Sequence, residues 1–243
     1  MNKTIVITGA SSGLGFSLAK RFLQNKDRVF GISKTKRHWK KAFSQIGKTD
    51  HFSLTQIDVT AQNSIRRYLK MVLKKAGKID VVINNAGYGG ALEHVDRLDT
   101  AEVNKHFKQN LISAFHVSKY VLPIFKKQRK GLILNVSSMA GKRAVPGLFA
   151  YSASKFGILA LSQCIAKENL NTGIKCVTIC PGGMNTEMRA HIFGESDAKK
   201  QQSTAFVADV IFQVANDDIK VESGGDIVIR HGKITAINPA PEA

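Results

Sequence analysis

The sequence has few cysteines, no long apolar run and half as many acidic as basic residues. Its three cysteines are Cys164, Cys176 and Cys180, and so sparse and odd a set argues against a disulfide framework. No His or further Cys follows Cys176 and Cys180 at the spacing of a zinc site, so no metal is expected. Both are predicted to be small apolar residues of one buried strand.

No apolar run approaches the ~20 residues that a membrane-spanning helix needs. The apolar stretch near the N-terminus is too short and too soon interrupted to be a signal peptide. We therefore expect a cytoplasmic protein without a membrane partner. A chain of 243 residues can bury a substantial core without disulfides, and the lack of a linker predicts one domain over residues 1–243.

The 36 basic and 18 acidic residues give a formal net charge of +18. Such a balance can indicate a partner that is a nucleic acid, an anionic lipid or an acidic protein. The basic residues are spread along the chain, however, and none of their clusters is interleaved with the aromatic residues that a single-strand binder uses. A lysine-rich solvated surface is therefore favoured over nucleic-acid binding.

Short β-branched runs alternate with longer helical patterns. The runs cover residues 4–7, 29–32, 52–57, 81–83, 132–136, 175–180 and 227–229. Several have no polar alternation, so both faces of their sheet are predicted to be buried. The pattern predicts an α/β fold, a doubly wound, Rossmann-like parallel sheet of seven strands with helices on both faces. Long helices are expected over about 101–127, where Pro123 can introduce a bend, and over about 149–169.

A glycine-rich turn follows the first predicted strand. Gly9 permits a tight turn, Gly13 lets a pyrophosphate approach the helix N-terminus, and Gly15 lets the helix pack close to the sheet. The strand before the turn and the helical pattern after it strengthen this interpretation. The spacing Gly-x-x-x-Gly-x-Gly is neither the common dinucleotide fingerprint nor a P-loop. A plain β-α turn is the alternative, but it would not need three glycines.

This turn and three later motifs resemble those of the short-chain dehydrogenase/reductase family. Residues 8–15 are similar to its cofactor loop, Asn84-Asn85-Ala86-Gly87 to its motif after the fourth strand, 151–155 to its Tyr-x-x-x-Lys motif, and 181–186 to its nicotinamide-side loop. The motifs occur in the family's order and spacing. The C-terminus departs from the family's Asp-Gly-Gly turn, because Gly224-Gly225-Asp226 precedes the last predicted strand and His231-Gly232 follows it.

The resemblance implies a nicotinamide cofactor and a set of contacts to it. These are Gly9, Ser11, Ser12, Gly13, Leu14 and Gly15 in the loop, Ser33, Lys34, Asp58 and Val59 on the adenosine side, Asn85, Ala86 and Gly87 after the fourth strand, and Tyr151, Lys155, Pro181, Gly182, Met184 and Thr186 on the nicotinamide side. Asp58 can accept from the adenine amine, or it can cap the helix that begins near Ala61.

The second predicted strand is not followed by the acid with which NAD enzymes usually bind the ribose hydroxyls. Ser33, Lys34, Lys36 and Arg37 occupy this place, and a cation there suits a 2′-phosphate. NADP(H) is therefore predicted in preference to NAD(H). Against this, the cations can be plain surface charge at a helix start, and Ser12 stands where many NADP(H)-dependent members of the family carry a basic residue.

Four residues are predicted to carry the chemistry. Tyr151 and Lys155 share a helix face, and a nearby ammonium is expected to lower the pKa of a tyrosine from about 10. The resemblance adds that Lys155 binds the nicotinamide ribose, that Ser138 holds the substrate oxygen, and that Asn110 supports a proton relay. Each also has a structural reading: a buried Tyr beside an extended Lys, a turn serine, and an asparagine in a helix–helix hydrogen bond.

Together these residues predict an oxidoreductase that interconverts a carbonyl and a secondary alcohol, with Tyr151 as general acid/base. Residues 184–203 are expected to form a substrate-side loop or lid over a small molecule. One alternative is a 3-oxoacyl-carrier-protein reductase whose acidic carrier docks on the basic residues 126–130, although a helix dipole already favours cations there. A nucleotide sensor without activity is disfavoured because the catalytic residues are present. The two long helices resemble those with which family members form homodimers or homotetramers.

Overall fold

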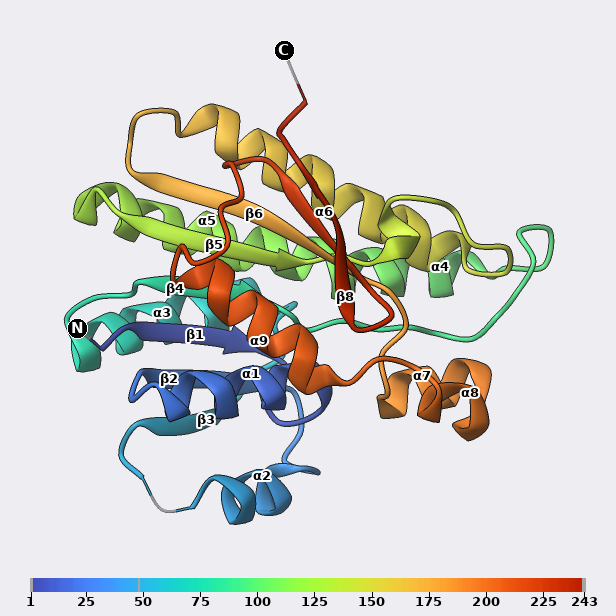
Figure 1. The fold of residues 1–243 in the computed structure, drawn as a ribbon, viewed down its shortest axis with the longest axis horizontal. Helices are drawn as coiled ribbons and strands as arrows, with labels where there is room; N and C mark the ends of the chain where they lie inside the picture. Colours follow the sequence, from blue (N-terminus) through green and yellow to red (C-terminus); the bar gives the residue numbers. More distant parts are fainter. Residues whose placement is uncertain (1, 48, 242–243) are drawn as a thin grey trace.

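The computed structural model describes residues 2–47 and 49–241 and has one sheet between two layers of helices (Figure 1). The strand order is β3-β2-β1-β4-β5-β6-β7-β8. The strands span Thr4–Thr8 (β1), Arg28–Ser33 (β2), Phe52–Gln56 (β3), Val81–Asn84 (β4), Gly131–Val136 (β5), Ile174–Pro181 (β6), Asp226–Arg230 (β7) and Lys233–Asn238 (β8). The first seven are parallel. The order reverses between β1 and β4, so a ligand crevice is expected at the carboxyl ends there.

The sheet contains one strand more than the seven predicted. β8 returns antiparallel to β7 through the two-residue turn His231-Gly232, whose φ angles are +51° and +69°. Positive φ at both positions is typical of a type I′ turn, which suits the twist of a hairpin. The strand count was therefore wrong by one edge strand, whereas the doubly wound α/β class is confirmed. The alternation along residues 233–238 and the His-Gly pair were the signals in the sequence.

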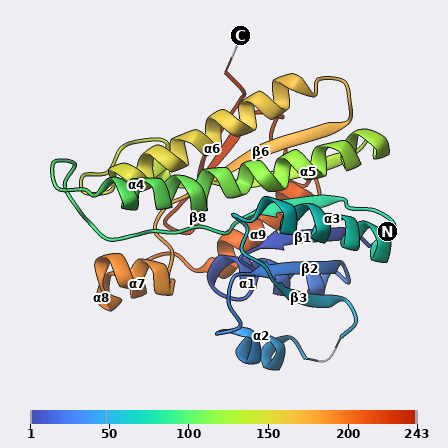
Figure 2. The ribbon, with the colours of Figure 1, turned by 180° about the vertical axis from the view of Figure 1, so that it is seen from behind.

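Helices cover both faces of the sheet (Figures 1 and 2). They span Gly13–Gln24 (α1), Trp39–Ile46 (α2), Gln62–Ala76 (α3), Thr100–His106 (α4), Ser113–Gln128 (α5), Phe149–Glu168 (α6), Glu187–Phe193 (α7), Glu195–Lys199 (α8) and Thr204–Ala215 (α9). Ile5 and Ile7 of β1 pack in the cluster under α1 and α9, and Val6 packs in the cluster under α3, α5 and α6. Both faces are buried, as the unbroken apolar runs predicted.

Two further expectations concern single elements. Cys176 and Cys180 are buried together in β6, as predicted. Within the described ranges, no helix is long and apolar enough to cross a membrane.

The long helix predicted over 101–127 is interrupted. Phe107–Ile112 forms a π-helical turn between α4 and α5, and α5 continues through Pro123. π-helical turns are rare and are often found at functional sites. The irregularity therefore falls on Asn110, which lies in the π-helical turn, and not near the proline.

Candidate active site

Two adjoining cavities open at the carboxyl ends of the parallel strands. Their volumes are about 480 Å³ and about 760 Å³. Ser137, Tyr151, Met184, Thr186 and Met188 line both. This edge of a doubly wound sheet is where such folds bind ligands. The arrangement suits two ligands that meet beside Tyr151.

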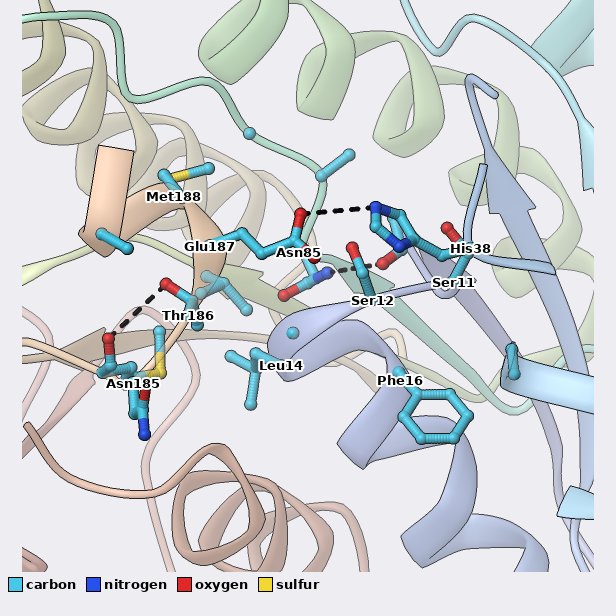
Figure 3. A pocket seen from close by; sticks show the side chains of 18 of the residues that line it. Ser11, Ser12, Leu14, Phe16, His38, Asn85, Asn185, Thr186, Glu187 and Met188 are labelled. Atoms are coloured by element: carbon cyan, nitrogen blue, oxygen red, sulfur yellow. Dashed lines mark hydrogen bonds and ion pairs between the residues drawn. The ribbon is translucent and has the colours of Figure 1, made fainter. Parts of the chain in front are cut away.

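The glycine-rich turn borders the first cavity. Figure 3 shows Ser11, Ser12 and Leu14 on one side of it and residues 186–188 on the other. Gly9 has a φ of +69°, a conformation that side chains with a Cβ rarely adopt. A Cβ on Gly15 would collide with the Gly9 carbonyl and the Asn85 amide, so glycine lets α1 pack against the turn. The start of α1 thereby borders the cavity and can bind a pyrophosphate.

The segment after β4 is hydrogen-bonded to this turn. Asn85 donates from Nδ2 to the Thr8 carbonyl at 2.9 Å. The backbone N–H groups of Asn85 and Ala86 donate to Thr8 Oγ1 at 3.0 and 2.9 Å. A Cβ on Gly87 would lie 3.6 Å from Lys155 Nζ. The predicted residues 85–87 therefore both stabilise the turn and line the first cavity.

The neighbouring Asn84 faces the core and not the cavity. Its Nδ2 donates to Asn135 Oδ1 at 2.8 Å, and Asn135 Nδ2 donates to Ser162 Oγ at 2.8 Å. Buried hydrogen-bonded chains of this kind rigidify the elements that they join. This one links β4 and β5 to α6, the helix that carries Tyr151 and Lys155.

Lys155 is buried beside the first cavity. The residue is only 4% exposed, and its Nζ donates to the Val136 carbonyl at 2.8 Å. The same nitrogen lies 5.7 Å from the centroid of the Tyr151 ring. Burial lowers the pKa of Lys155 to about 8, because apolar surroundings disfavour the ammonium. The amine can therefore gain or lose a proton near neutral pH.

The pKa of Tyr151 is shifted in the direction opposite to the one expected. Burial raises it above the ordinary value of 10.0, and the hydrogen bond with Ser138 and the charge of Arg189 oppose that shift only in part. The expectation that Lys155 lowers this pKa was wrong for this structure, because desolvation of the phenol dominates. A tyrosine that keeps its proton at neutral pH is suited to donate it.

Ser138 follows β5 and lines the second cavity together with Tyr151. Its Oγ accepts from the Ala140 N–H at 3.1 Å. The adjacent Ser137 instead donates to the Lys155 carbonyl at 2.8 Å, which ties the strand end to α6. Both serines line the second cavity, but the hydroxyl of Ser137 is committed to the Lys155 carbonyl.

Asn110 is held by bonds to a loop and to α6. Its Nδ2 donates to Ser154 Oγ at 2.9 Å and to the Tyr88 carbonyl at 3.0 Å, while its Oδ1 accepts from the Tyr88 N–H at 2.7 Å. The bond to Ser154 reaches the residue directly before Lys155. The structure brings Asn110 to the back of the site, although no direct bond to Lys155 is present among these.

Four predicted adenosine-side contacts lie outside the lining of the first cavity: Ser33, Lys34, Asp58 and Val59. Ser33 Oγ accepts from Trp39 Nε1 at 2.6 Å and donates to the Thr35 carbonyl at 2.9 Å. Lys34 Nζ pairs with Asp58 Oδ2 at 3.0 Å.

Asp58 does not cap α3 with its side chain. It accepts from the Thr60 N–H at 2.9 Å, and the N-cap position of α3 is occupied by Ala61, which makes no side-chain hydrogen bond to the helix. The first cavity is lined by His38 and Lys41, and not by the four predicted adenosine-side contacts. Sequence reasoning missed these two residues, although the basic stretch after the second strand pointed to them.

Residues 184–203, here called the lid segment, form a wall of both cavities. They contain α7 and α8, which are joined by Arg189 and Asp197 through two contacts of 2.5 and 3.1 Å. Glu187 Oε2 lies 3.5 Å from His38 Nε2 (Figure 3). The lid segment thereby contacts the residues after β2 on the far side of the first cavity.

The basic residues 126–130 lie at the other end of the molecule. They span the end of α5 and the residues directly before β5 begins at Gly131, and therefore lie at the amino ends of the parallel strands, away from α7 and α8 (Figures 1 and 2). Docking of a carrier protein at these residues stays a prediction.

Known proteins resemble the chain over most of its length. The family model described as short chain dehydrogenase matches residues 3–197. The chain is 36% identical over 187 residues to oxidoreductase BOA17 of Botryotinia fuckeliana (77% of this chain, 68% of that protein). It is 31% identical over 249 residues to the 3-oxoacyl-[acyl-carrier-protein] reductase FabG of Thermotoga maritima (96% and 98%). The solved structure of ElxO with NADP bound matches with a TM-score of 0.86 at 26% identity, covering 94% of this chain and 97% of that one.

Proposed function

Because this chain belongs to the short-chain dehydrogenase family of oxidoreductases, we propose that it interconverts a carbonyl and a secondary alcohol by hydride transfer with NADP(H). The observation that carries the proposal is the meeting of two cavities at Tyr151, with Lys155 on the side of the first and Ser138 on the side of the second. One cavity suits the cofactor and the other the substrate.

The residues of the first cavity fit a dinucleotide. The glycine turn and the start of α1 offer N–H groups to a pyrophosphate, and Lys155 with residues 85–87 lies where a nicotinamide ribose would be held. When bound, the nicotinamide supplies the hydride. Every proton step is then assigned to side chains of this chain.

Protonation of the substrate oxygen is assigned to Tyr151. The Ser138 hydroxyl orients that oxygen in the second cavity, and Tyr151 donates its proton to it as hydride arrives. Lys155, whose pKa is about 8, returns a proton to Tyr151. Asn110 acts as a positioning residue behind Lys155, through its bond to Ser154. The reverse reaction uses the same groups with Tyr151 as base.

We expect kcat/KM to be at least about tenfold higher with NADPH than with NADH across a panel of ketones, aldehydes and secondary alcohols. ElxO, a protein of the same fold, has been solved with NADP bound. In this chain the cations after β2, Lys34 and Arg37, are exposed and can turn toward a 2′-phosphate. The measurement is optical detection of cofactor oxidation or reduction.

The matched variants for this prediction are Lys34→Ala and, as control, Lys70→Ala on the exposed side of α3. Loss of Lys34 removes a cation and leaves Asp58 without its partner, so kcat/KM with NADPH should fall about tenfold while the value with NADH holds. A preference of the unmodified protein for NADH would refute the NADP(H) assignment.

The lid segment is proposed to close over the substrate. Met188 and Ile192 pack against Gly89, and Glu187 Oε2 contacts His38 Nε2. These contacts, which hold α7 in its present position, can be broken and remade. All described elements belong to one sheet and its covering helices, which supports a single dinucleotide-binding domain over residues 1–243.

A second candidate function is reduction of 3-oxoacyl groups. The similarity to FabG of Thermotoga maritima extends over nearly the whole of both chains and favours it. Comparing carrier-linked with free 3-oxoacyl substrates separates the two candidates, because only a carrier-dependent enzyme loses most of its kcat/KM with the free form.

The oligomer is proposed to be a homodimer or homotetramer formed through α5 and α6. Phe115, Phe149 and Phe156 on these helices are 42%, 46% and 45% exposed, and an apolar patch formed by such side chains would be typical of an interface. Light scattering at assay concentration is expected to give at least twice the mass of one chain. Phe156→Glu should shift the protein toward monomer, and Leu170→Glu, at a site 70% exposed beyond α6, should not. A monomeric unmodified protein would contradict the proposal.

A further inference from the structure

The second cavity has an apolar part and a cationic part. Met139, Val145, Leu148, Ile192 and Phe193 provide the apolar surface. Four cationic residues also line it: Arg143, Arg189, Lys200 and Arg230. Among the described residues that line this cavity, none is acidic. A substrate beside Tyr151 would therefore lie among several positive charges, with no acidic side chain in the described lining of the cavity.

Only one of the four cations is neutralised by a partner. Arg189 forms the paired contacts with Asp197 described above. Within residues 2–47 and 49–241, no carboxylate lies within 4 Å of the charged groups of Arg143, Lys200 or Arg230. The adjacent Lys142, by contrast, pairs with Asp226 at 2.7 Å. Three of the four cations that line the second cavity are therefore without a carboxylate partner among the described residues.

Arg230 is positioned by the β7–β8 hairpin, whose second strand was not predicted. It is the last residue of β7, and its Cγ would lie 3.3 Å from a Cβ on Gly182, so its stem runs over the loop after β6. Gln202 donates to the Ile229 carbonyl at 3.0 Å and accepts from the Gly232 N–H at 3.2 Å. The β7–β8 turn is thereby joined to the end of the lid segment.

Lys200 and Arg230 also lie outside the part of the chain that the family model matches, which ends at residue 197. The charge of the cavity therefore comes in part from residues that the family model does not cover. Cations that converge in a concave, partly apolar site raise the local concentration of anions, and arginine binds carboxylate and phosphate oxygens through two parallel hydrogen bonds.

From this arrangement we infer that the substrate is acidic: a ketone or secondary alcohol with an apolar middle and a carboxylate or phosphate at its far end. Arg143 and Arg230 bind the anionic group, Lys200 adds charge, and the reacting carbon lies beside Tyr151 and Ser138. The inference rests on the proposed function, because it takes the second cavity as the substrate site.

The test compares three matched series of methyl ketones of graded chain length: oxo acids, their methyl esters, and oxoalkyl phosphates. Their binding to the protein saturated with NADP⁺ is measured by calorimetry, and their turnover with NADPH is measured separately. We expect an acid or a phosphate of suitable length to bind roughly tenfold to a hundredfold more tightly than the neutral ester, as expected for one or more charge-assisted hydrogen bonds. The series that binds best distinguishes carboxylate from phosphate.

The variant for this test is Arg143→Met/Arg230→Met, and its matched control is Arg66→Met on the exposed side of α3. The ratio of anion to ester affinity should fall toward one in the double variant and hold in the control. If the double variant does not fold, the unmodified protein still provides a test, because added salt should reduce the ratio by screening the cations.

The inference is overturned if esters bind as tightly as anions at every chain length, or if the double variant keeps the preference. Failure of the proposed function has a different signature. Anions that bind tightly without being turned over would support the anion site and refute the reductase. Turnover of acids and esters at equal kcat/KM would support the reductase and refute the anion site.

Discussion

Tyr151→Phe should lower kcat about a thousandfold or more, while the Kd for NADPH changes less than about threefold. The substitution removes only the phenolic hydroxyl, which lies where the two cavities meet. Burial raises the pKa of this group, so it carries a proton throughout the neutral range and can donate it to the forming alkoxide. General acids of this kind contribute about 10²–10⁴ in rate, which sets the size of the expected loss.

The measurement is kcat with the best carbonyl of the panel, together with a fluorescence titration of NADPH. Tyr120→Phe is the matched control, because this half-buried tyrosine of α5 accepts from Gln62 and is remote from both cavities. It should retain nearly full activity. Retention of most activity by Tyr151→Phe would remove this tyrosine from the proton step.

Lys155→Met should abolish turnover and, at the same time, make the protein without cofactor more stable at pH 7. The ammonium of Lys155 is buried, and its pKa is lowered from 10.5 to about 8. The folded state therefore disfavours a charge that the unfolded state carries without cost. A shift of this size corresponds to about 3 kcal/mol, and loss of the bond to the Val136 carbonyl offsets about 1 kcal/mol of it. We expect the free energy of unfolding to rise by about 2 kcal/mol.

The pH dependence follows from the same shift. Between about pH 8 and pH 10.5 the unfolded state binds a proton at Lys155 that the folded state does not, so this group's contribution to stability increases with pH in that window. The destabilisation by Lys155 is complete below about pH 8. The difference in unfolding free energy between Lys155→Met and the unmodified protein should therefore be largest near pH 7 and should shrink toward pH 10.

Urea unfolding without cofactor measures this difference, since a bound cofactor would stabilise the folded state by itself. Lys70→Met, at an exposed position of α3, is the control and should show no such pH-dependent difference. A Lys155→Met protein that is less stable than the unmodified one at pH 7 would show that the lysine is not held there against a desolvation penalty. Stability gained where activity is lost is typical of residues kept for chemistry.

Local patterns explain which parts of the site were predictable. The glycine turn, the residues 85–87 and the Tyr151–Lys155 pair each depend on residues within a few positions of one another. Their geometry follows from a turn, a strand end or one helical turn. The structure brings all of these to the first cavity, except Gly15, which packs against the Gly9 carbonyl of the turn.

The adenosine-side contacts illustrate the limit of such patterns. Lys34 directly follows β2, and Asp58 lies shortly after β3, so the ion pair of Lys34 with Asp58 forms only because these strands are neighbours in the sheet. The bond from Trp39 to Ser33 likewise depends on how α2 folds back on the strand. Residue type and position predicted that Ser33 and Lys34 contact a 2′-phosphate. They could not show that Trp39 and Asp58 already bind these two side chains.

The sequence by itself determined the class of the fold, the order of its first seven strands and the candidates for the reacting side chains, because strand and helix periodicity, turn chemistry and helix spacing are encoded by near neighbours. Only the tertiary structure decided the direction of the Tyr151 pKa, the eighth strand's place at the sheet edge, and the charge of the second cavity. Burial and electrostatics depend on distance in space. Arg143, Lys200 and Arg230 face one cavity although they come from three separate segments of the chain.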